Sequence, residues 1–197
     1  MHTAQTHRIT ETIEPAAHDA SSMTAVVQGR YGTADVFELR EIPRPTLGDH
    51  DVLVRVAAAG VDRGVWHLMT GRPRLTRVAF GLRRPRNPVP GLDVAGVVDT
   101  VGPRVTRFSE GDLVFGTGHG TFAQYARAGE DHLARIPTNI TLTEAGVLAV
   151  TGSTALQAVE DHGRVHPGDQ VLVLGASGGV GTYAVQIASA LGGTVTG

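Results

Sequence analysis

A short apolar segment that runs into a glycine-rich turn is the feature that most constrains the fold of this chain. Residues 170–174 read Gln-Val-Leu-Val-Leu, and residues 175–181 read Gly-Ala-Ser-Gly-Gly-Val-Gly. A strand that is apolar at nearly every position is typically buried on both faces, at the centre of a parallel sheet. The next segment predicts an amphipathic helix with one apolar face made by Val180, Ala184, Ile187, Ala188 and Leu191. Gly192-Gly193 ends that helix, and a second strand begins at Thr194.

The order strand, glycine turn, helix, strand predicts the opening of a βαβ nucleotide-binding unit. Glycines let a diphosphate approach the backbone without meeting a Cβ, and the helix N-terminus offers free N–H groups and a partial positive charge. We expect N–H groups from residues 178–181 and a hydroxyl donor from Ser177. The candidate cofactor-binding residues of the turn are Gly175, Ala176, Ser177, Gly178, Gly179, Val180 and Gly181.

The turn departs from the G-x-G-x-x-G pattern at one position. Ala176 stands where the first glycine belongs, and Gly175 is expected to make the turn instead. We expect this arrangement to fit NADP at least as well as NAD. The residue that decides between them lies ~20 residues further on, at the end of the next strand, and the sequence ends before it.

The same residues also match G-x-S-x-G, the nucleophile elbow of α/β hydrolases, with Ser177 as the nucleophile. In that fold an acid and a His follow the Ser along the chain. No Asp, Glu or His follows Ser177 here, and the β-rich first half does not suit a hydrolase sheet. The dinucleotide interpretation is therefore favoured over the hydrolase.

Residues 24–135 show short apolar runs separated by Gly, Pro and Asp turns, which predict strands. The expected strands are 25–28, 36–42, 51–59, 94–101, 112–115 and 122–126. Several short strands of this kind favour a sandwich or a barrel. Between them, residues 62–69 have room for one or two helical turns, with Asp62 as the N-cap.

After Pro137 the apolar spacing changes from two to three and four, which predicts helices over residues 141–150 and 153–162. Thr141 and Glu144 have the spacing of a capping box. We therefore expect a disordered extension over residues 1–22, a β domain over 23–140, and a second domain over 141–197 that begins with linking helices.

Composition narrows the function classes. A net charge of −2 does not suit nucleic-acid binding, which favours a clustered excess of Lys and Arg. No apolar run reaches the ~20 residues of a membrane span, and residues 1–22 lack the apolar stretch of a secretory signal. With no Cys, disulfides and thiolate chemistry are excluded, and a reducing cytoplasm is compatible. The segment Arg72 to Arg86 holds six Arg and no acid. A solvated loop explains it best, and an anion-attracting rim for a phosphorylated cofactor is the alternative.

Metal binding is not expected. A catalytic zinc in a dehydrogenase uses Cys, His and a further Cys or acid. This chain has no Cys, and its histidines at positions 50, 67, 119, 132 and 162 show no short ligand spacing. We interpret them as surface or core histidines.

Six segments and the glycine turn carry a resemblance to a known superfamily. They are Ala58 to Asp62, Val89 to Val98, Phe108 to Gly116, Gly120 to Tyr125, Gly152 to Gln157 and Val165 to Gly175. In this order they resemble the medium-chain dehydrogenase/reductase superfamily, in its zinc-independent quinone oxidoreductase-like branch. The resemblance covers nearly all of residues 23–197.

The resemblance implies an α/β protein: a GroES-like β-barrel domain, then the first part of a Rossmann domain with a doubly wound parallel sheet, and an active site in the cleft between them. It implies hydride transfer from NADPH to a quinone, an enone or a similar carbonyl acceptor, with no metal. It also implies a small-molecule substrate and, in many members, a homodimer. The cytoplasm is the expected location.

Several positions depart from the family pattern. Zinc-dependent relatives carry Gly-His-Glu where this chain has Gly-Leu92-Asp, and Leu92 cannot bind a metal. Quinone oxidoreductases often carry Asn at the position of Asp62, and Asp at that of Val65, where a polar group would line the nicotinamide pocket. Asp62 is also a candidate helix cap. Trp66 either walls the pocket or packs in the core, and Thr154 either lies near the cofactor or bonds back to its own helix.

Three hypotheses follow: an NADPH-dependent reductase, a non-catalytic member of the same fold, and the hydrolase. We assign no catalytic base, because hydride transfer needs positioning and a polarised acceptor more than a side-chain nucleophile. The strands that bind ribose and nicotinamide in the family lie beyond Gly197, so this chain is expected to bind NADPH poorly and to turn over little by itself. Micromolar binding in a cofactor-fluorescence titration would contradict that expectation.

Overall fold

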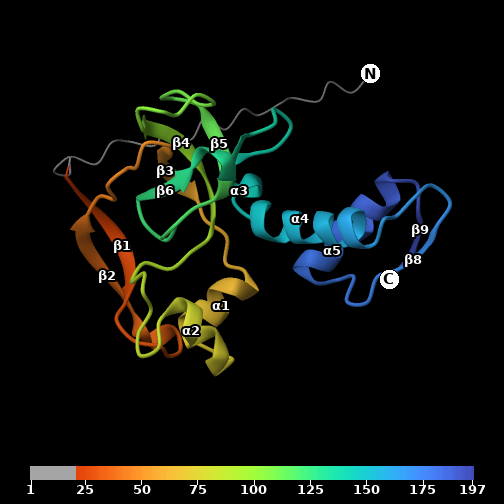
Figure 1. Cartoon of the computed structure of the whole chain (residues 1–197), viewed down its shortest axis with the longest axis horizontal. Coiled ribbons are helices and arrows are strands. Elements are labelled where there is room, and N and C mark those ends of the chain that lie inside the picture. Colours follow the sequence, from red (N-terminus) through yellow and green to blue (C-terminus); the bar gives the residue numbers. More distant parts are fainter. Residues whose placement is uncertain (1–20) are drawn as a thin grey trace, which may run out of the picture.

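The computed structural model describes residues 21–197 (Figure 1). The extension expected over residues 1–22 lies outside this range except at its last two residues. Ser22 already belongs to the first strand, β1 (Ser22–Gln28). The predicted extension therefore overlaps β1 at Ser22, and the rest of that prediction lies outside the described residues.

The first half of the described chain is β-rich. β1 pairs antiparallel with β2 (Phe37–Pro43), and a second, five-stranded sheet has the order β6-β3-β4-β5-β7. Its strands are β3 (Asp51–Ala58), β4 (Asp93–Val101), β5 (Leu113–Thr117), β6 (Tyr125–Gly129) and β7 (Leu133–Arg135). All neighbours in this sheet are antiparallel. The predicted GroES-like β architecture is confirmed.

The core of this part is built from alternating β residues. Val52, Val54, Val94 and Val114 are fully buried, and they pack around the ring of Phe108, which is 5% exposed. Val52 and Val54, which alternate along the predicted strand 51–59, therefore lie on the buried face of β3. Burial of apolar side chains is the dominant favourable contribution to folding.

One predicted strand was displaced. Residues 122–126 were expected to form a single strand, but Phe122 to Gln124 pair by backbone hydrogen bonds with β1, and β6 starts at Tyr125. The N–H of Val26 donates to the carbonyl of Phe122 over 2.8 Å. Residues 122–126 thus pass from the two-stranded sheet to the five-stranded sheet and connect the two sheets.

Two short helices lie below the sheets in Figure 1, namely α1 (Arg63–Thr70) and α2 (Arg77–Phe80), with a 3-10 turn at Arg74–Thr76 between them. Asp62 is the N-cap of α1, as predicted: its carboxylate accepts the N–H of Val65. Further 3-10 turns occupy Ala34–Val36 and Glu130–His132.

The helices that follow Pro137 differ from the prediction. The structure has α3 (Leu142–Ala145), then α4 (Ala149–Leu156), which continues as a π-helical segment over Gln157–His162. The capping box of Thr141 and Glu144 is present. The break falls at residues 146–148 rather than 151–152. Gly146 there packs against Ala58 so closely that a Cβ would lie 2.7 Å from the Ala58 Cβ.

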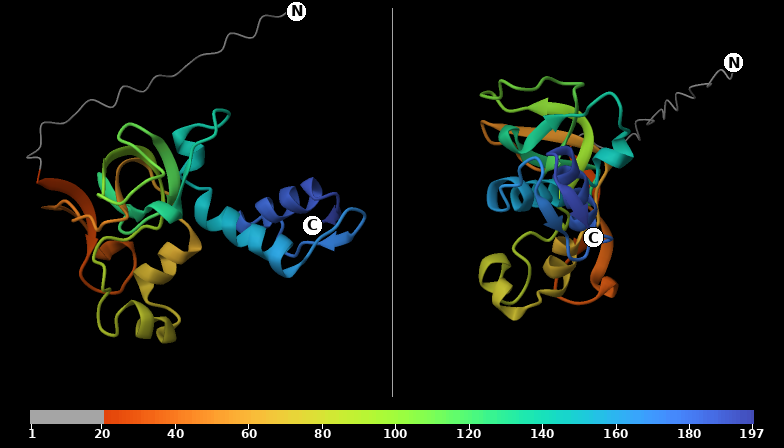
Figure 2. Two further views of the ribbon diagram at one scale, coloured as in Figure 1. Left: turned by 45° about the horizontal axis from the view of Figure 1, so that its top comes forward. Right: turned by 90° about the vertical axis from the view of Figure 1, so that its right-hand side faces the viewer.

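The last part is a small parallel α/β unit that projects away from the sheets (Figures 1 and 2). It consists of β8 (Gln170–Leu172), α5 (Gly179–Ala190) and β9 (Thr194–Thr196), and β8 pairs with β9 in parallel, as predicted. α5 packs against α4, with Ala155, Val159, Ala184 and Ala188 buried between the elements. This is the expected start of a Rossmann-like sheet.

The expectation that this first strand is buried on both faces was wrong. Val171 and Val173 pack into the core of the unit, but Leu172 is 67% exposed and Leu174 is 87% exposed. Within residues 21–197, β9 is the one strand that pairs with β8, and helices cover one face of the pair. The sequence predicted the strand and its apolar side chains correctly, but how far those side chains are buried depends on the elements packed beside the strand.

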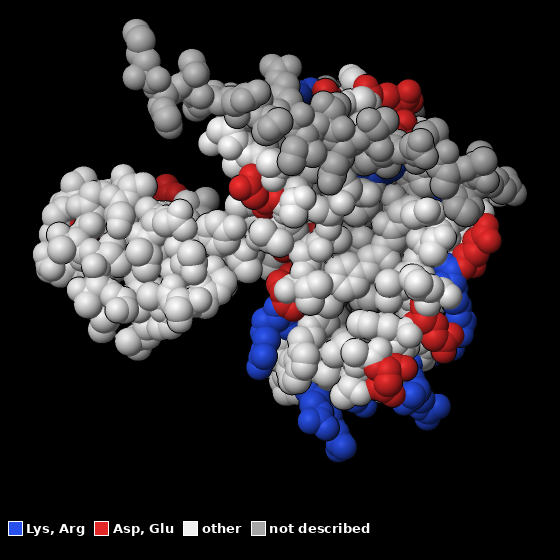
Figure 3. Space-filling model, turned by 180° about the vertical axis from the view of Figure 1, so that it is seen from behind, with Lys and Arg blue, Asp and Glu red and all other residues white. Residues whose placement is uncertain are grey.

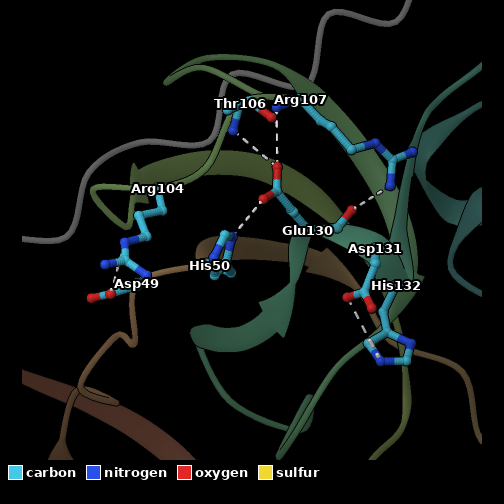
Figure 4. A network of polar contacts seen from close by, with 8 residues as sticks. All are labelled: Asp49, His50, Arg104, Thr106, Arg107, Glu130, Asp131 and His132. Carbon is cyan, nitrogen blue, oxygen red and sulfur yellow. Dashed lines mark hydrogen bonds and ion pairs between the residues drawn. The ribbon is translucent and has the colours of Figure 1, made fainter.

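A carboxylate ties three loops of the β-rich part together (Figure 4). Glu130 accepts the N–H groups of Thr106 and Arg107, and its other oxygen lies 3.0 Å from Nδ1 of His50. These contacts, led by the one with His50, lower the pKa of Glu130 to about 2. Figure 3 shows charged side chains gathered on this part, whereas the visible face of the α/β unit carries few.

No helix within residues 21–197 is long and apolar enough to cross a membrane.

Candidate functional site

The glycine turn has the backbone that a phosphate cradle requires. Gly175 has a φ of 78°, a left-handed conformation that favours glycine, and its carbonyl accepts the N–H of Gly178 over 3.0 Å. α5 begins at the next residue, Gly179. Gly175 therefore makes the turn, as expected from its place before Ala176.

Gly181 holds the helix close to the end of the strand. A Cβ at this position would lie 2.1 Å from the Gly175 carbonyl oxygen, which no side chain can tolerate. A Cβ at Gly179 would meet only Cγ2 of Thr151, at an ordinary 3.5 Å. The two glycines thus differ sharply in what they allow, although both lie in the first turn of α5.

The first turn of α5 presents free donors. The N–H groups of Gly179, Val180 and Gly181 have no partner within the helix, because the first N–H groups of any α-helix lack one. No side chain caps this end of α5. The Gly178 N–H, expected to serve the same purpose, is instead used inside the turn. Three backbone donors at a positive helix end fit a diphosphate.

A cleft of about 730 Å³ runs from this helix end to the β-rich part. Val61 and Asp62 at the start of α1 line it from one side, and Gly179, Val180 and Tyr183 of α5 line it from the other. Thr151 of α4 completes the wall between them. Residues more than 100 positions apart in the sequence are thereby brought to one site.

Asp62 has two roles in this cleft. Its Oδ1 accepts the N–H of Val65 over 2.8 Å, so the proposed capping role is real. Its Oδ2 is buried and has no hydrogen-bond partner within residues 21–197. A buried carboxylate oxygen without a donor is rare in folded proteins, and the second role of Asp62 would be to accept from a ligand in the cleft once that oxygen is uncovered.

Asp93 is a second carboxylate of the cleft, and the sequence analysis assigned it no role. It is 1% exposed, and its Oδ1 accepts the N–H of Val150 over 2.7 Å, at the first turn of α4. Burial raises the pKa of Asp93 to about 6, the charge of Asp62 adds to the rise, and the hydrogen bond from Val150 opposes it. An acid at the start of the apolar run 93–98 was the available signal.

Among the sequence candidates, Asp62, Gly179 and Val180 line the cleft. The other turn residues, 175–178 and 181, lie outside its lining, as do Trp66, Thr154 and Val65. The ring of Trp66 is 37% exposed and lies beneath the guanidinium of Arg63. Thr154 is exposed, and its hydroxyl donates to the carbonyl of Val150 in its own helix. Val65 is buried in the core, and Ser177 is exposed. Thr151, one turn before Thr154, takes the lining position.

The arginine-rich segment 72–86 is mostly exposed. Arg77 is the structural exception, since its guanidinium stacks on Tyr31 and donates to the carbonyl of Gly71. Within residues 21–197 no group of three or more His, Asp or Glu side chains is placed to hold a metal ion. Neither finding adds a charged ligand site to the cleft.

Comparison with known proteins places the chain in a family. Residues 48–138 match the alcohol dehydrogenase GroES-like domain. The quinone oxidoreductase of Lama guanicoe is 36% identical over 172 residues, which cover 85% of this chain and 50% of that protein. The chain belongs to the medium-chain dehydrogenase/reductase superfamily, in its quinone oxidoreductase-like branch.

Solved structures agree with this family. The quinone oxidoreductase from Coxiella burnetii has a TM-score of 0.77 at 28% identity, covering 88% of this chain and 55% of that one. A mycobacterial protein complexed with NADPH has a TM-score of 0.76 at 29% identity, covering 88% and 52%. This chain spans about half the length of the relatives it matches.

Proposed function

We propose that this chain supplies the acceptor-side β domain and the first βαβ unit of an oxidoreductase that transfers a hydride from NADPH to a quinone, an enone or another carbonyl acceptor. The observation that carries the proposal is the meeting of two kinds of group in one cleft. Backbone donors of Gly179 and Val180 lie on one side, and the carboxyls of Asp62 and Asp93 lie on the other.

The residues of the first turn of α5 would bind the diphosphate of the cofactor through their N–H groups. When bound, NADPH supplies the hydride. Asp93 can hold a proton in this cleft, and the carboxylate oxygens of Asp62 and Asp93 can accept a hydrogen bond from a ligand, as can the hydroxyl of Tyr183. Val147 and Val180 give the cleft apolar walls that displace water. The proposal assigns no catalytic base.

The proposed enzyme uses NADPH without zinc, and its two parts have the boundaries predicted from the sequence. NADPH is preferred over NADH on the strength of the family resemblance and of the mycobacterial relative solved with NADPH. Chemistry without zinc is supported by Leu92, whose side chain has no donor atom. The β domain is assigned to residues 23–140 and the nucleotide-binding part to residues 141–197, and the homodimer stays a prediction for size-exclusion chromatography.

The serine hydrolase and the non-catalytic member of the fold require different properties of the glycine turn. A serine hydrolase needs Ser177 next to a base, and no hydrogen bond joins the Ser177 hydroxyl to a His or an acid within the described residues. A non-catalytic member would keep the fold without binding cofactor at the turn. Cofactor binding therefore separates these possibilities.

The test is a titration of the purified chain with NADPH, followed by cofactor fluorescence, for the original chain and two variants. We expect binding weaker than micromolar for the original chain. Gly181→Ala should abolish it, because the added Cβ pushes α5 away from the Gly175 carbonyl. Gly152→Ala in α4 is the matched control, since its Cβ meets nothing within 4 Å and Gly152 lies outside the turn and the cleft lining. Equal titration curves for the two variants would contradict the proposal.

A further inference from the structure

A separate cavity lies inside the β-rich part. Its volume is about 260 Å³, close to the lower end of the ~300–1,000 Å³ usual for ligand pockets. Its walls come from α1, α2 and the loop before β4, and they are largely apolar, with Leu68, Phe80, Val89 and Leu92 among them. None of the residues that line it also lines the cleft between α1 and α5.

One polar side chain on the wall of this cavity has an atom without a partner. Gln28 of β1 is 2% exposed, and its Nε2 lies 3.4 Å from the carbonyl oxygen of Leu68, to which it donates. Its Oε1 is buried and has no hydrogen-bond partner in the part of the chain that the structure describes. Exchanging the two amide atoms would set two oxygens against each other at Leu68, so the acceptor is Oε1.

A lone water is poorly suited to this place. A buried water is stabilised by two to four polar partners, and the wall around Gln28 is apolar. Exposed polar residues on the wall, namely Arg86, Asn87 and His119, mark one open side. A ligand that enters there would place an apolar body against Phe80 and Leu92 and reach Gln28 with a donor.

We propose that this cavity binds a small apolar molecule carrying one hydroxyl or N–H donor, with Oε1 of Gln28 as the acceptor for that donor. A pocket built around a single buried acceptor selects strongly against analogues that lack the donor, because binding them leaves the acceptor unpaired. The site is independent of the hydride-transfer proposal, and its test contains no cofactor.

The test uses p-cresol and toluene as probes, which share a ring and a methyl group and differ in the hydroxyl. Binding is measured by ligand-observed NMR on the purified chain. We expect p-cresol to bind roughly 10-fold more tightly than toluene. In Gln28→Met, which removes the acceptor at similar volume, this preference should vanish. Equal binding of both probes, or binding of neither, would overturn the proposal.

A second pair of variants keeps the test decisive if Gln28→Met does not fold. Ala79 is exposed on α2 and lines the cavity, so Ala79→Phe fills it from outside without touching the core. Ala190 is exposed on α5, away from the cavity, and Ala190→Phe is the matched control. Binding of p-cresol should be lost in Ala79→Phe alone, and its persistence there would refute the site.

Discussion

The β-rich part and the terminal α/β unit differ in how fully they bury the apolar side chains of their strands. In the first, five antiparallel strands enclose fully buried valines such as Val52 and Val94. In the second, the residues buried between helix and strand are mostly alanines, and Leu172 and Leu174 lie at the surface. Both segments read as strands in the sequence, so apolar content alone does not tell how well a strand is covered.

This difference shows that the closed apolar core and the expected diphosphate-binding turn lie in different regions of the molecule. The β-rich part has a closed core and the ties of Glu130, whereas the α/β unit carries the glycine turn and its free N–H groups. Asp93 connects the two, because it is the first residue of β4 and its carboxylate accepts the N–H of Val150 in the first turn of α4. We expect substitutions in the core of the first part to change unfolding, and those in the glycine turn of the second to change diphosphate binding.

The largest expected effect comes from Phe108. Replacing this core ring in Phe108→Ala should destabilise the protein by about 3–5 kcal/mol, because it removes apolar burial and leaves a cavity. Leu174→Ala is the matched change in the α/β unit, and with a side chain that is 87% exposed it should alter stability by less than ~0.5 kcal/mol. Urea unfolding measures both. Similar effects would break the comparison.

Asp93 should give stability an unusual dependence on pH. Its pKa rises from 3.8 to about 6 on folding, so the folded state binds the proton more tightly than the unfolded state. Its contribution is then favourable at low pH and is lost as pH rises from about 4 to 6, by up to roughly 3 kcal/mol. Asp93→Asn keeps the acceptor for Val150 but cannot titrate.

Unfolding of the two proteins should therefore be compared at several pH values. The stability of Asp93→Asn relative to the original chain should rise between pH 4 and 7, by the amount that the carboxyl loses. A difference that stays constant over this range would show that Asp93 does not titrate as its burial implies.

Glu130 should show the opposite sign. Its hydrogen bonds lower its pKa from 4.5 to about 2, so it stabilises the folded state above pH 4.5 and this contribution is lost as pH falls toward 2. Glu130→Gln should lower the thermal midpoint at neutral pH by a few degrees and match the original chain near pH 2. A midpoint that is unchanged at pH 7 would show that the ties in Figure 4 are weak in solution.

The smallest expected effect lies in α4, which joins the two regions. A Cβ at Gly152 would meet nothing within 4 Å. Gly152→Ala should raise stability by about 0.5–1 kcal/mol, because alanine loses less backbone entropy in a helix interior. Thermal unfolding measures it. A loss of stability would mean that the helix is distorted at this point.

Local features were predictable from the sequence. The glycine turn, α5, the Asp62 cap and the capping box at Thr141 each depend on residues a few positions apart, and each is present in the structure. Their residue types act on the adjacent backbone alone, so no knowledge of distant segments is needed.

Features set by distant contacts were not predictable. The start of β6 depends on the pairing of Phe122 with β1, and the start of α4 depends on Asp93, 57 residues before Val150. The burial of Gln28 likewise comes from α1 and the loop before β4, which the alternation of β1 does not reveal. Asp93 and Thr151 were missed for the same reason.

The account rests on three backbone donors at the start of α5, and amide chemical shifts test them most directly. A ¹⁵N-labelled chain titrated with NADPH should show its largest shifts at Gly179, Val180 and Gly181, with smaller shifts at the cleft residues Thr151 and Tyr183. If saturating NADPH left those three amides in place, or moved only amides of the β-rich part, the cofactor would not bind where this account puts it.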